Sequence, residues 1–309
     1  MSGSDGPERM NITMKPPAIL GLILALALLP IVARSQSSEP NLFARSNLVA
    51  WCIVPFDSKK RGPAERAELV QHLGLSAVAY DWRPEHVTQF EQEILEYQKR
   101  GLRYFAFWGQ HDEAYRLFEK HGLKPQFWLM LRSPNASTQA ENVRLAVEQV
   151  LPMAQRAAKL GSTVALYNHG GWSGEPENMF AICRELRERH GVKDAGIVYN
   201  LHHGHDHVAR FPAILTLLQP YLVCINLNGM TSNGDKVGKK ILPLGQGELD
   251  LQLFREILDS GYRGPIGILG HTQNDVEDQL RDNLDGLDWL VAQLEGRPAG
   301  PKPQARTLR

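Results

Sequence analysis

The chain has 309 residues, of which 43% are hydrophobic, and its 34 Lys and Arg side chains equal its 34 Asp and Glu side chains in number. The charge is balanced, and the sequence has neither a basic stripe that would indicate nucleic-acid binding nor an acidic tail that would indicate disorder. Three cysteines are too few for a disulfide scaffold. The length is sufficient for one large α/β domain with a substantial core.

The N-terminal segment differs from the rest of the chain. An apolar run covers residues 18–32, Lys15 precedes it, and small residues follow it. The run is short for a membrane span, which needs about 20 residues. The pattern predicts a secretory signal over 1–35 that is cleaved after Ser35, and therefore an exported protein, periplasmic or extracellular. An uncleaved signal would be its only membrane contact. Residues 36–46 are predicted to form a linker.

Between residues 47 and 295, eight short apolar runs alternate with amphipathic stretches. In one such stretch, Phe90, Ile94 and Tyr97 recur at helical spacing. Strands that are apolar on both faces and alternate with helices form a parallel sheet covered by those helices. Eight such units predict a closed (β/α)8 TIM barrel of the α/β class. The predicted strands are 48–56, 75–82, 103–108, 125–131, 163–168, 195–201, 221–227 and 264–270.

An open doubly wound sheet is the alternative to the barrel. It would carry a G-x-G-x-x-G phosphate turn after its first strand, whereas residues 54–63 read VPFDSKKRGP. The closed barrel is therefore favoured. Residues 296–309 carry three prolines and no apolar periodicity, which predicts a disordered tail.

Polar and aromatic residues gather at the C-terminal ends of the predicted strands. Six of the eleven histidines lie at three of these ends. Because the βα loops of a barrel converge at that face, the sequence predicts a ligand site there. The stretches are YDWR at 80–83, YNHGG at 167–171, NLHHGHDH at 200–207, NLNG at 226–229 and GHTQ at 270–273.

Tryptophans near the strand ends indicate a carbohydrate ligand. An indole face packs on the apolar face of a sugar ring while its N–H binds a hydroxyl. Trp82 and Trp172 lie in polar, loop-like segments and are predicted to stack on sugar. Trp108 and Trp128 either contact sugar or fill the barrel.

Four sequence features make the chain similar to the xylose-isomerase-like barrels, a superfamily of sugar isomerases, epimerases and endonuclease-IV-type enzymes. The resemblance covers about residues 47–294. It implies a small-molecule carbohydrate as ligand, a divalent metal held between the last four strands, and two carboxylates that move a proton beside a sugar carbonyl. The features are NHGG at 168–171, NLHH at 200–203, LGQGELD at 244–250 and G-Y-x-G-P-I-x-I at 261–268.

The metal ligands of this superfamily do not carry over to the sequence. Tyr167 stands in place of a glutamate, and Asn200 in place of the aspartate of an Asp-x-x-His pattern. Asn226 or Asn228 matches the usual histidine, and the stretch 268–271 lacks the usual glutamate. Neutral ligands seldom hold magnesium or manganese against the hydration shell of the ion. We therefore expect either no cofactor or a zinc-like divalent metal. Its candidate ligands are His169, His203, His205 and His271.

Proton transfer by histidine is the chemistry that the sequence predicts. Imidazoles titrate near neutrality, so His203 or His271 is expected to remove the proton beside a sugar carbonyl. Lys239 or Asn228 would then stabilise the enolate oxygen. Three hypotheses stay open: an isomerase or epimerase, a lyase that eliminates 3-keto-glycosides, and a barrel that binds carbohydrate without catalysis. The predicted substrate-binding residues are Tyr80, Asp81, Trp82, Trp108, Tyr167, Asn168, His169, Trp172, Asn200, His202, Asn226 and Asn228.

Overall fold

The structure is a computed structural model, and it describes residues 3, 6, 11 and 41–308. The apolar run of the predicted signal and its cleavage site at Ser35 lie outside the described residues. Within the described part of the chain, no helix is both long and apolar enough to cross a bilayer.

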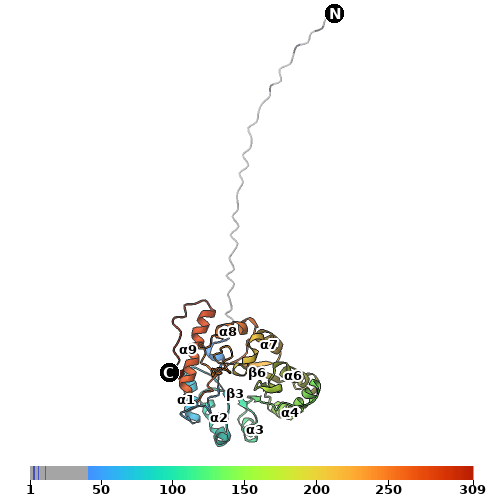
Figure 1. The fold of residues 1–309 in the computed structure, drawn as a ribbon, viewed down its shortest axis with the longest axis vertical. Coiled ribbons are helices and arrows are strands. Elements are labelled where there is room, and N and C mark those ends of the chain that lie inside the picture. The colour runs from blue at the N-terminus through green and yellow to red at the C-terminus, as the bar shows by residue number, and fades with distance from the viewer. Residues whose placement is uncertain (1–2, 4–5, 7–10, 12–40, 309) are drawn as a thin grey trace. The chain divides into compact units, whose positions relative to one another are not determined.

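Eight parallel strands close into a barrel in chain order, and the eighth strand pairs with the first. The predicted (β/α)8 barrel is confirmed, and Figure 1 shows its helices arranged around the strands. The strands are β1 Leu48–Trp51, β2 Ala77–Tyr80, β3 Arg103–Trp108, β4 Gln126–Leu129, β5 Val164–Tyr167, β6 Ala195–Asn200, β7 Leu222–Leu227 and β8 Ile266–Leu269. The helices are α1 Pro63–His72, α2 Phe90–Lys99, α3 Asp112–Lys120, α4 Gln139–Leu160, α5 Gly171–Gly174, α6 Pro176–His190, α7 Phe211–Leu218, α8 Asp250–Asp259 and α9 Val276–Leu294.

Two tryptophans fill the inside of the barrel. The rings of Trp51 and Trp128 meet edge to face, with their centroids 4.8 Å apart. Alanines at Ala79, Ala106 and Ala165, all fully buried, leave room for these rings. An eight-stranded barrel is just wide enough for such a mixture of large and small side chains. Trp51 is the last residue of β1, so its ring lies at the C-terminal end of this packed interior.

The folded domain begins earlier than predicted. Leu42 and Phe43, assigned to the linker from the sequence, are buried, and the Phe43 ring stacks on Phe254 of α8 at a centroid distance of 4.9 Å. The Asn47 side chain donates to the carbonyl of Leu42 at 2.7 Å. The end of the predicted linker is therefore part of the barrel domain.

The prediction of a disordered C-terminal tail is wrong for residues 296–308. Asp282 of α9, which is buried, accepts hydrogen bonds from Arg306 N and Thr307 N, both at 2.9 Å. The Thr307 hydroxyl and the Arg306 guanidinium also donate to this carboxylate, each at 2.8 Å. These contacts are polar and involve a charged side chain on another element. The spacing of apolar residues could therefore not predict them.

Candidate functional site

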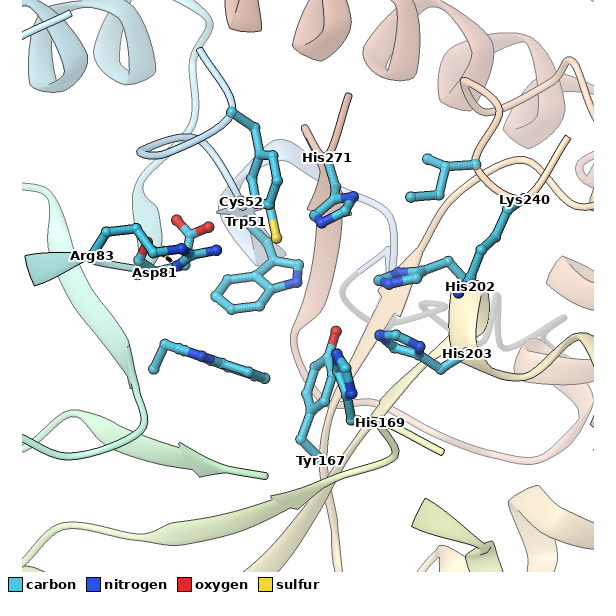
Figure 2. A pocket seen from close by; sticks show the side chains of 13 residues that line it. Trp51, Cys52, Asp81, Arg83, Tyr167, His169, His202, His203, Lys240 and His271 are labelled. Carbon is cyan, nitrogen blue, oxygen red and sulfur yellow. Dashed lines mark hydrogen bonds between the residues drawn. The ribbon is translucent and has the colours of Figure 1, made fainter. Parts of the chain in front are cut away.

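A cavity of about 270 Å³ opens at the C-terminal face of the barrel (Figure 2). Its walls come from the ends of six strands and from the chain between β7 and α8, and the Trp51 ring, which lines it, packs against Trp128 in the barrel interior. Seven lining residues were predicted from the sequence: Asp81, Trp108, Tyr167, His169, His202, His203 and His271. Six were not: Trp51, Cys52, Phe56, Arg83, Lys240 and Ile241.

Four histidines form one wall of the cavity. The ring of His203 lies 3.8 Å from that of His202 and 4.4 Å from that of His169, measured between centroids. His271 stacks on His202 at 5.5 Å. Adjacent residues in a strand point to opposite faces, but His202 and His203 lie in a 3-10 turn, Leu201–His203, directly after β6. The Asn200 side chain caps this turn by accepting from His202 N at 3.3 Å.

All four imidazoles are neutral at pH 7. Burial lowers the pKa of His203 to about 3 and that of His202 well below its usual value. The pKa values of His169 and His271 are also lowered, mainly by burial. Repulsion from the other histidines and from the nearby Lys240 charge also lowers the pKa values of His202 and His203. Each ring therefore has one nitrogen that donates a hydrogen bond and one that accepts.

A buried carboxyl group, that of Asp81, lies on the opposite side of the cavity (Figure 2). It follows β2 directly, and one of its oxygens accepts from Val54 N at 3.4 Å. Burial raises the pKa of Asp81 to about 7, although the neighbouring Arg83 charge opposes this shift. The Arg83 guanidinium donates to the carbonyl oxygens of Asp81 and Trp82, at 3.2 and 2.7 Å. At neutral pH this carboxyl group can therefore both accept and release a proton.

Three buried polar atoms of the cavity wall lack a hydrogen bond of normal geometry to any described residue, although the Cys52 thiol interacts with the Asp81 carboxyl group and the Tyr167 hydroxyl with the Trp51 indole. The three atoms are Trp51 Nε1, Asp81 Oδ2 and His202 Nδ1. Leaving such an atom unpaired costs about 1–3 kcal/mol, so buried polar atoms nearly always have a partner. The Trp51 N–H can donate, the Asp81 oxygen can accept, and the His202 nitrogen can do either. Such a set around one small cavity matches a ligand with several hydroxyl or carbonyl groups.

The backbone after β1 explains why two adjacent residues reach the cavity. Cys52 has φ +58°, a left-handed conformation that costs energy for any residue other than glycine. The chain turns there, and both Trp51 and Cys52 line the cavity. Burial raises the pKa of the Cys52 thiol well above its ordinary value, so the group is a thiol and not a thiolate.

A segment between β7 and α8, residues 228–249, brings Lys240 to the cavity. Lys239, predicted to stabilise an enolate, does not line the cavity, whereas Lys240 does. The Lys240 carbonyl oxygen lies 2.9 Å from His205 Nε2 and 3.4 Å from Asn228 Nδ2, which donates to it. The segment is closed at its base by Gly229 N, which donates to Leu242 O at 2.7 Å. These contacts determine which of the two lysines reaches the site.

Asp250 anchors the same segment from the first residue of α8. Its buried carboxylate accepts from the backbone N–H groups of Met230 at 2.6 Å, Gly245 at 2.7 Å and Gly247 at 3.0 Å. Gly245 has φ +79°, and a Cβ on Gly247 would lie 2.2 Å from the Met230 backbone. The LGQGELD motif therefore forms a tight turn around one carboxylate.

A family model that describes xylose isomerase-like TIM barrels matches residues 112–292, more than half of the chain. The chain belongs to this family. A search of curated proteins found no match.

Solved structures with the same fold include several enzymes. The 3-keto-D-glucoside 4-epimerase of E. coli, in its apo form, is 15% identical with a TM-score of 0.57, and the match covers 80% of this chain and 99% of that one. The IOLI protein with a bound zinc atom is 13% identical, with a TM-score of 0.61 and coverages of 80% and 98%. D-allulose 3-epimerase from Methylomonas sp., in complex with D-allulose, is 14% identical, with a TM-score of 0.54 and coverages of 82% and 98%. At these identities the likeness shows the fold alone.

The residues present do not fit the divalent metal that the xylose isomerase-like family implies. Tyr167, in place of a glutamate, accepts a hydrogen bond from the Asn200 side chain, and Leu269 is buried at the end of β8. In the part of the chain that the structure describes, no three His, Cys, Asp or Glu side chains are placed to hold a metal ion. Of the four histidines predicted for a zinc-like metal, His205 lies outside the cavity lining, near the Lys240 carbonyl. The other three, His169, His203 and His271, line the cavity.

Three of the predicted aromatic substrate contacts lie outside the cavity. Tyr80 points outward and packs against Phe90 and Phe107 between the strands and the helices. Trp82 packs with the same two rings, and its N–H donates to the Trp108 carbonyl at 2.7 Å. Trp172 donates to the Gln139 side chain at 2.9 Å and does not line the cavity. The polar residues beside Trp82 and Trp172 in the sequence indicated that these side chains lie in loops. They could not indicate whether the rings point into the cavity.

The four predicted asparagines support the cavity without lining it. Asn168 and Asn200 join β5 to β6, since Asn168 Nδ2 donates to Asn200 O at 3.0 Å and Asn200 N donates to Asn168 Oδ1 at 2.8 Å. Asn226 faces Gly267, where a Cβ would lie 1.8 Å from its side-chain oxygen. Asn228 binds the backbone of the β7–α8 segment.

Proposed function

We propose that the protein is an enzyme that acts on a carbohydrate of about one sugar ring and removes a proton from the carbon beside a carbonyl group. The observation that carries this proposal is a set of three buried polar atoms around one cavity, Trp51 Nε1, Asp81 Oδ2 and His202 Nδ1, none of which has a hydrogen bond of normal geometry to a described residue. The cavity volume of about 270 Å³ lies just below the usual range for small-molecule sites, which favours a small ligand. The aromatic rings of Trp51, Trp108 and Tyr167 supply apolar surface for a sugar ring.

Asp81 is the proposed base. A catalytic acid or base works best when its pKa lies near the operating pH, and burial brings the pKa of Asp81 to about 7. His203, one of the two bases predicted from the sequence, has a pKa lowered to about 3 and is a weak proton acceptor. The neutral imidazoles are better suited to binding the hydroxyl groups of the sugar.

Arg83 is the proposed source of positive charge for the reaction. Loss of the proton places negative charge on the carbonyl oxygen, and a fixed cation beside the base stabilises that charge. The Arg83 side chain is held by two backbone carbonyls and by the Phe56 ring, 5.5 Å from the guanidinium carbon. Return of the proton to the same or another carbon would give an epimer or an isomer. Loss of a neighbouring group would give elimination, which shares the first step.

Two solved structures support the substrate class without identifying the substrate. Their names describe an epimerase of a 3-keto-glucoside and an epimerase bound to D-allulose, a ketose. Both compounds carry a carbonyl group beside carbons that bear hydroxyls. A barrel that only bound sugar would need the aromatic rings and hydroxyl partners, but not a buried carboxyl group in the wall of the cavity itself.

Exchange of hydrogen with solvent tests the proposal even when the product is unidentified. The protein is incubated in deuterium oxide with 3-keto-glycosides and with free ketoses, and the proton signals beside each carbonyl are followed by NMR. We expect at least one compound to lose that signal at a rate proportional to the protein concentration. Mass analysis of the products then separates epimerisation, isomerisation and elimination. Saturable sugar binding with no exchange in any compound would support the non-catalytic barrel instead.

Export of the enzyme is a second part of the proposal. The apolar run at 18–32 with its positive flank supports it, and an exported enzyme would encounter glycans more often than phosphorylated sugars. When the full chain is expressed in a secretion-competent host, the mature protein is expected to begin at Gln36. Intact-mass measurement of the fraction outside the cytoplasm checks this. A full-length protein retained in the cytoplasm would contradict export.

A further inference from the structure

Lys240 is a cation at the cavity with no counterion. In the described part of the chain, no carboxylate forms an ion pair with its ammonium group. Asp81 is the carboxyl group of the cavity lining, and Figure 2 shows it on the far side, beside Arg83, whereas Lys240 lies on the side of His202 and His203. The positive charge of Lys240 therefore lies on a different wall of the cavity from Asp81 and Arg83.

The backbone at Lys240 is held in place by residues of two other segments. Its carbonyl oxygen lies 2.9 Å from His205 Nε2, after β6, and accepts from Asn228 Nδ2, after β7, at 3.4 Å. The backbone of the neighbouring Lys239 is also held, because its N–H donates to Gly234 O at 2.7 Å. The two lysines differ in that Lys240 lines the cavity and Lys239 does not.

A second atom on the same wall also lacks a partner. His202 is buried, and its Nδ1 has no hydrogen bond to any described residue. Lys240 and the four histidines line the same cavity, and Figure 2 shows Lys240 beside His202 and His203. An ammonium group together with an imidazole nitrogen that can carry the ring proton matches an oxygen-bearing anion.

We infer that this wall binds a carboxylate and that the substrate is a sugar acid, such as a hexuronate, held with its carboxylate at Lys240 and its reacting carbon at Asp81. This inference rests on the proposed function, because it takes a carbohydrate as the ligand. One ammonium group matches the single charge of a carboxylate, whereas a phosphate group carries about −1.5 to −2 at pH 7. The wall offers neutral imidazoles and no second cation for the extra charge.

Matched pairs of ligands test the inference by calorimetry on the wild-type protein. The pairs are D-glucuronate with D-glucose, D-galacturonate with D-galactose, and D-mannuronate with D-mannose. We expect at least one uronate to bind about twofold to fivefold more tightly than its parent hexose, an effect reduced from that of a buried pair because Lys240 is exposed. The preference should weaken as salt is added, because salt screens the interaction.

Lys240→Gln is expected to remove the preference, and Lys239→Gln, the same charge change one residue away, is expected to retain it. Unchanged thermal unfolding of both variants shows that they are folded. Equal binding of uronate and hexose, or a preference that survives Lys240→Gln, would overturn the inference and leave the proposed function intact. Tight binding of D-glucose 6-phosphate alone would also overturn it, in favour of a phosphate ligand. If the preference is present but no carbonyl sugar exchanges its proton, the anion site stands and the proposed function fails.

Discussion

Asp81→Asn is expected to lower kcat/KM for proton exchange by about 10²-fold to 10⁴-fold, the usual contribution of a general base. The amide keeps the size of the side chain and a hydrogen-bond acceptor for Val54 N, but it cannot take up a proton. Exchange rates in deuterium oxide, measured for the wild type and the variant under the same conditions, check the prediction. Full activity in the variant would show that another group is the base.

The pH dependence of the wild type distinguishes Asp81 from histidine. The base must be ionised, and Asp81 is protonated below its pKa of about 7, so kcat/KM should fall as the pH falls through about 7. If His203 were the base, its pKa of about 3 would keep the activity constant down to about pH 4. His203→Gln is a suitable control, because it should raise KM without moving the midpoint near pH 7.

Asp250→Ala is expected to lower the free energy of unfolding by about 3–5 kcal/mol. Three backbone N–H groups lose their acceptor, and each unsatisfied buried group costs roughly 1–3 kcal/mol. Because the carboxylate holds both ends of the β7–α8 segment, the variant should also lose the binding contribution of Lys240. Denaturant unfolding and uronate titration measure the two effects.

Asp259→Ala, at the other end of the same helix, is the matched control for this change. Asp259 is exposed and should contribute less than about 0.5 kcal/mol. Asp250→Asn should lie between the two variants, since the amide oxygen still accepts hydrogen bonds. If Asp250→Ala unfolds like the Asp259 variant, the carboxylate does not anchor the segment.

The fold could be predicted from the sequence because its signals are local and repeated. Each strand is an apolar run, and each is followed by a helix with its own spacing, so eight repeats identify the barrel. The tail was missed because it is held by Asp282 through polar contacts across sequence positions far apart. Hydropathy carries no information on such pairs.

The site was predicted only in part, for a different physical reason. Strand ends converge by topology, so His169, His203 and His271 could be placed together from the sequence. The direction of a side chain in a loop depends on backbone angles, which the sequence does not reveal. Cys52 lines the cavity because its own backbone is in the left-handed conformation. Lys240 lines it because its backbone contacts His205 in the loop after β6. Polar composition likewise suggested Trp82 and Trp172, whose rings point elsewhere.

The four neutral histidines have a consequence for selectivity. A neutral imidazole exists as two tautomers of similar energy, and a proton shift within the ring exchanges its donor and its acceptor. A wall built from His169, His202, His203 and His271 can therefore present either role at nearly the same position. Hydroxyl groups of opposite configuration need different patterns of donors and acceptors. For the proposed reaction, one set of side chains would accommodate the substrate and its epimer without any movement of the backbone.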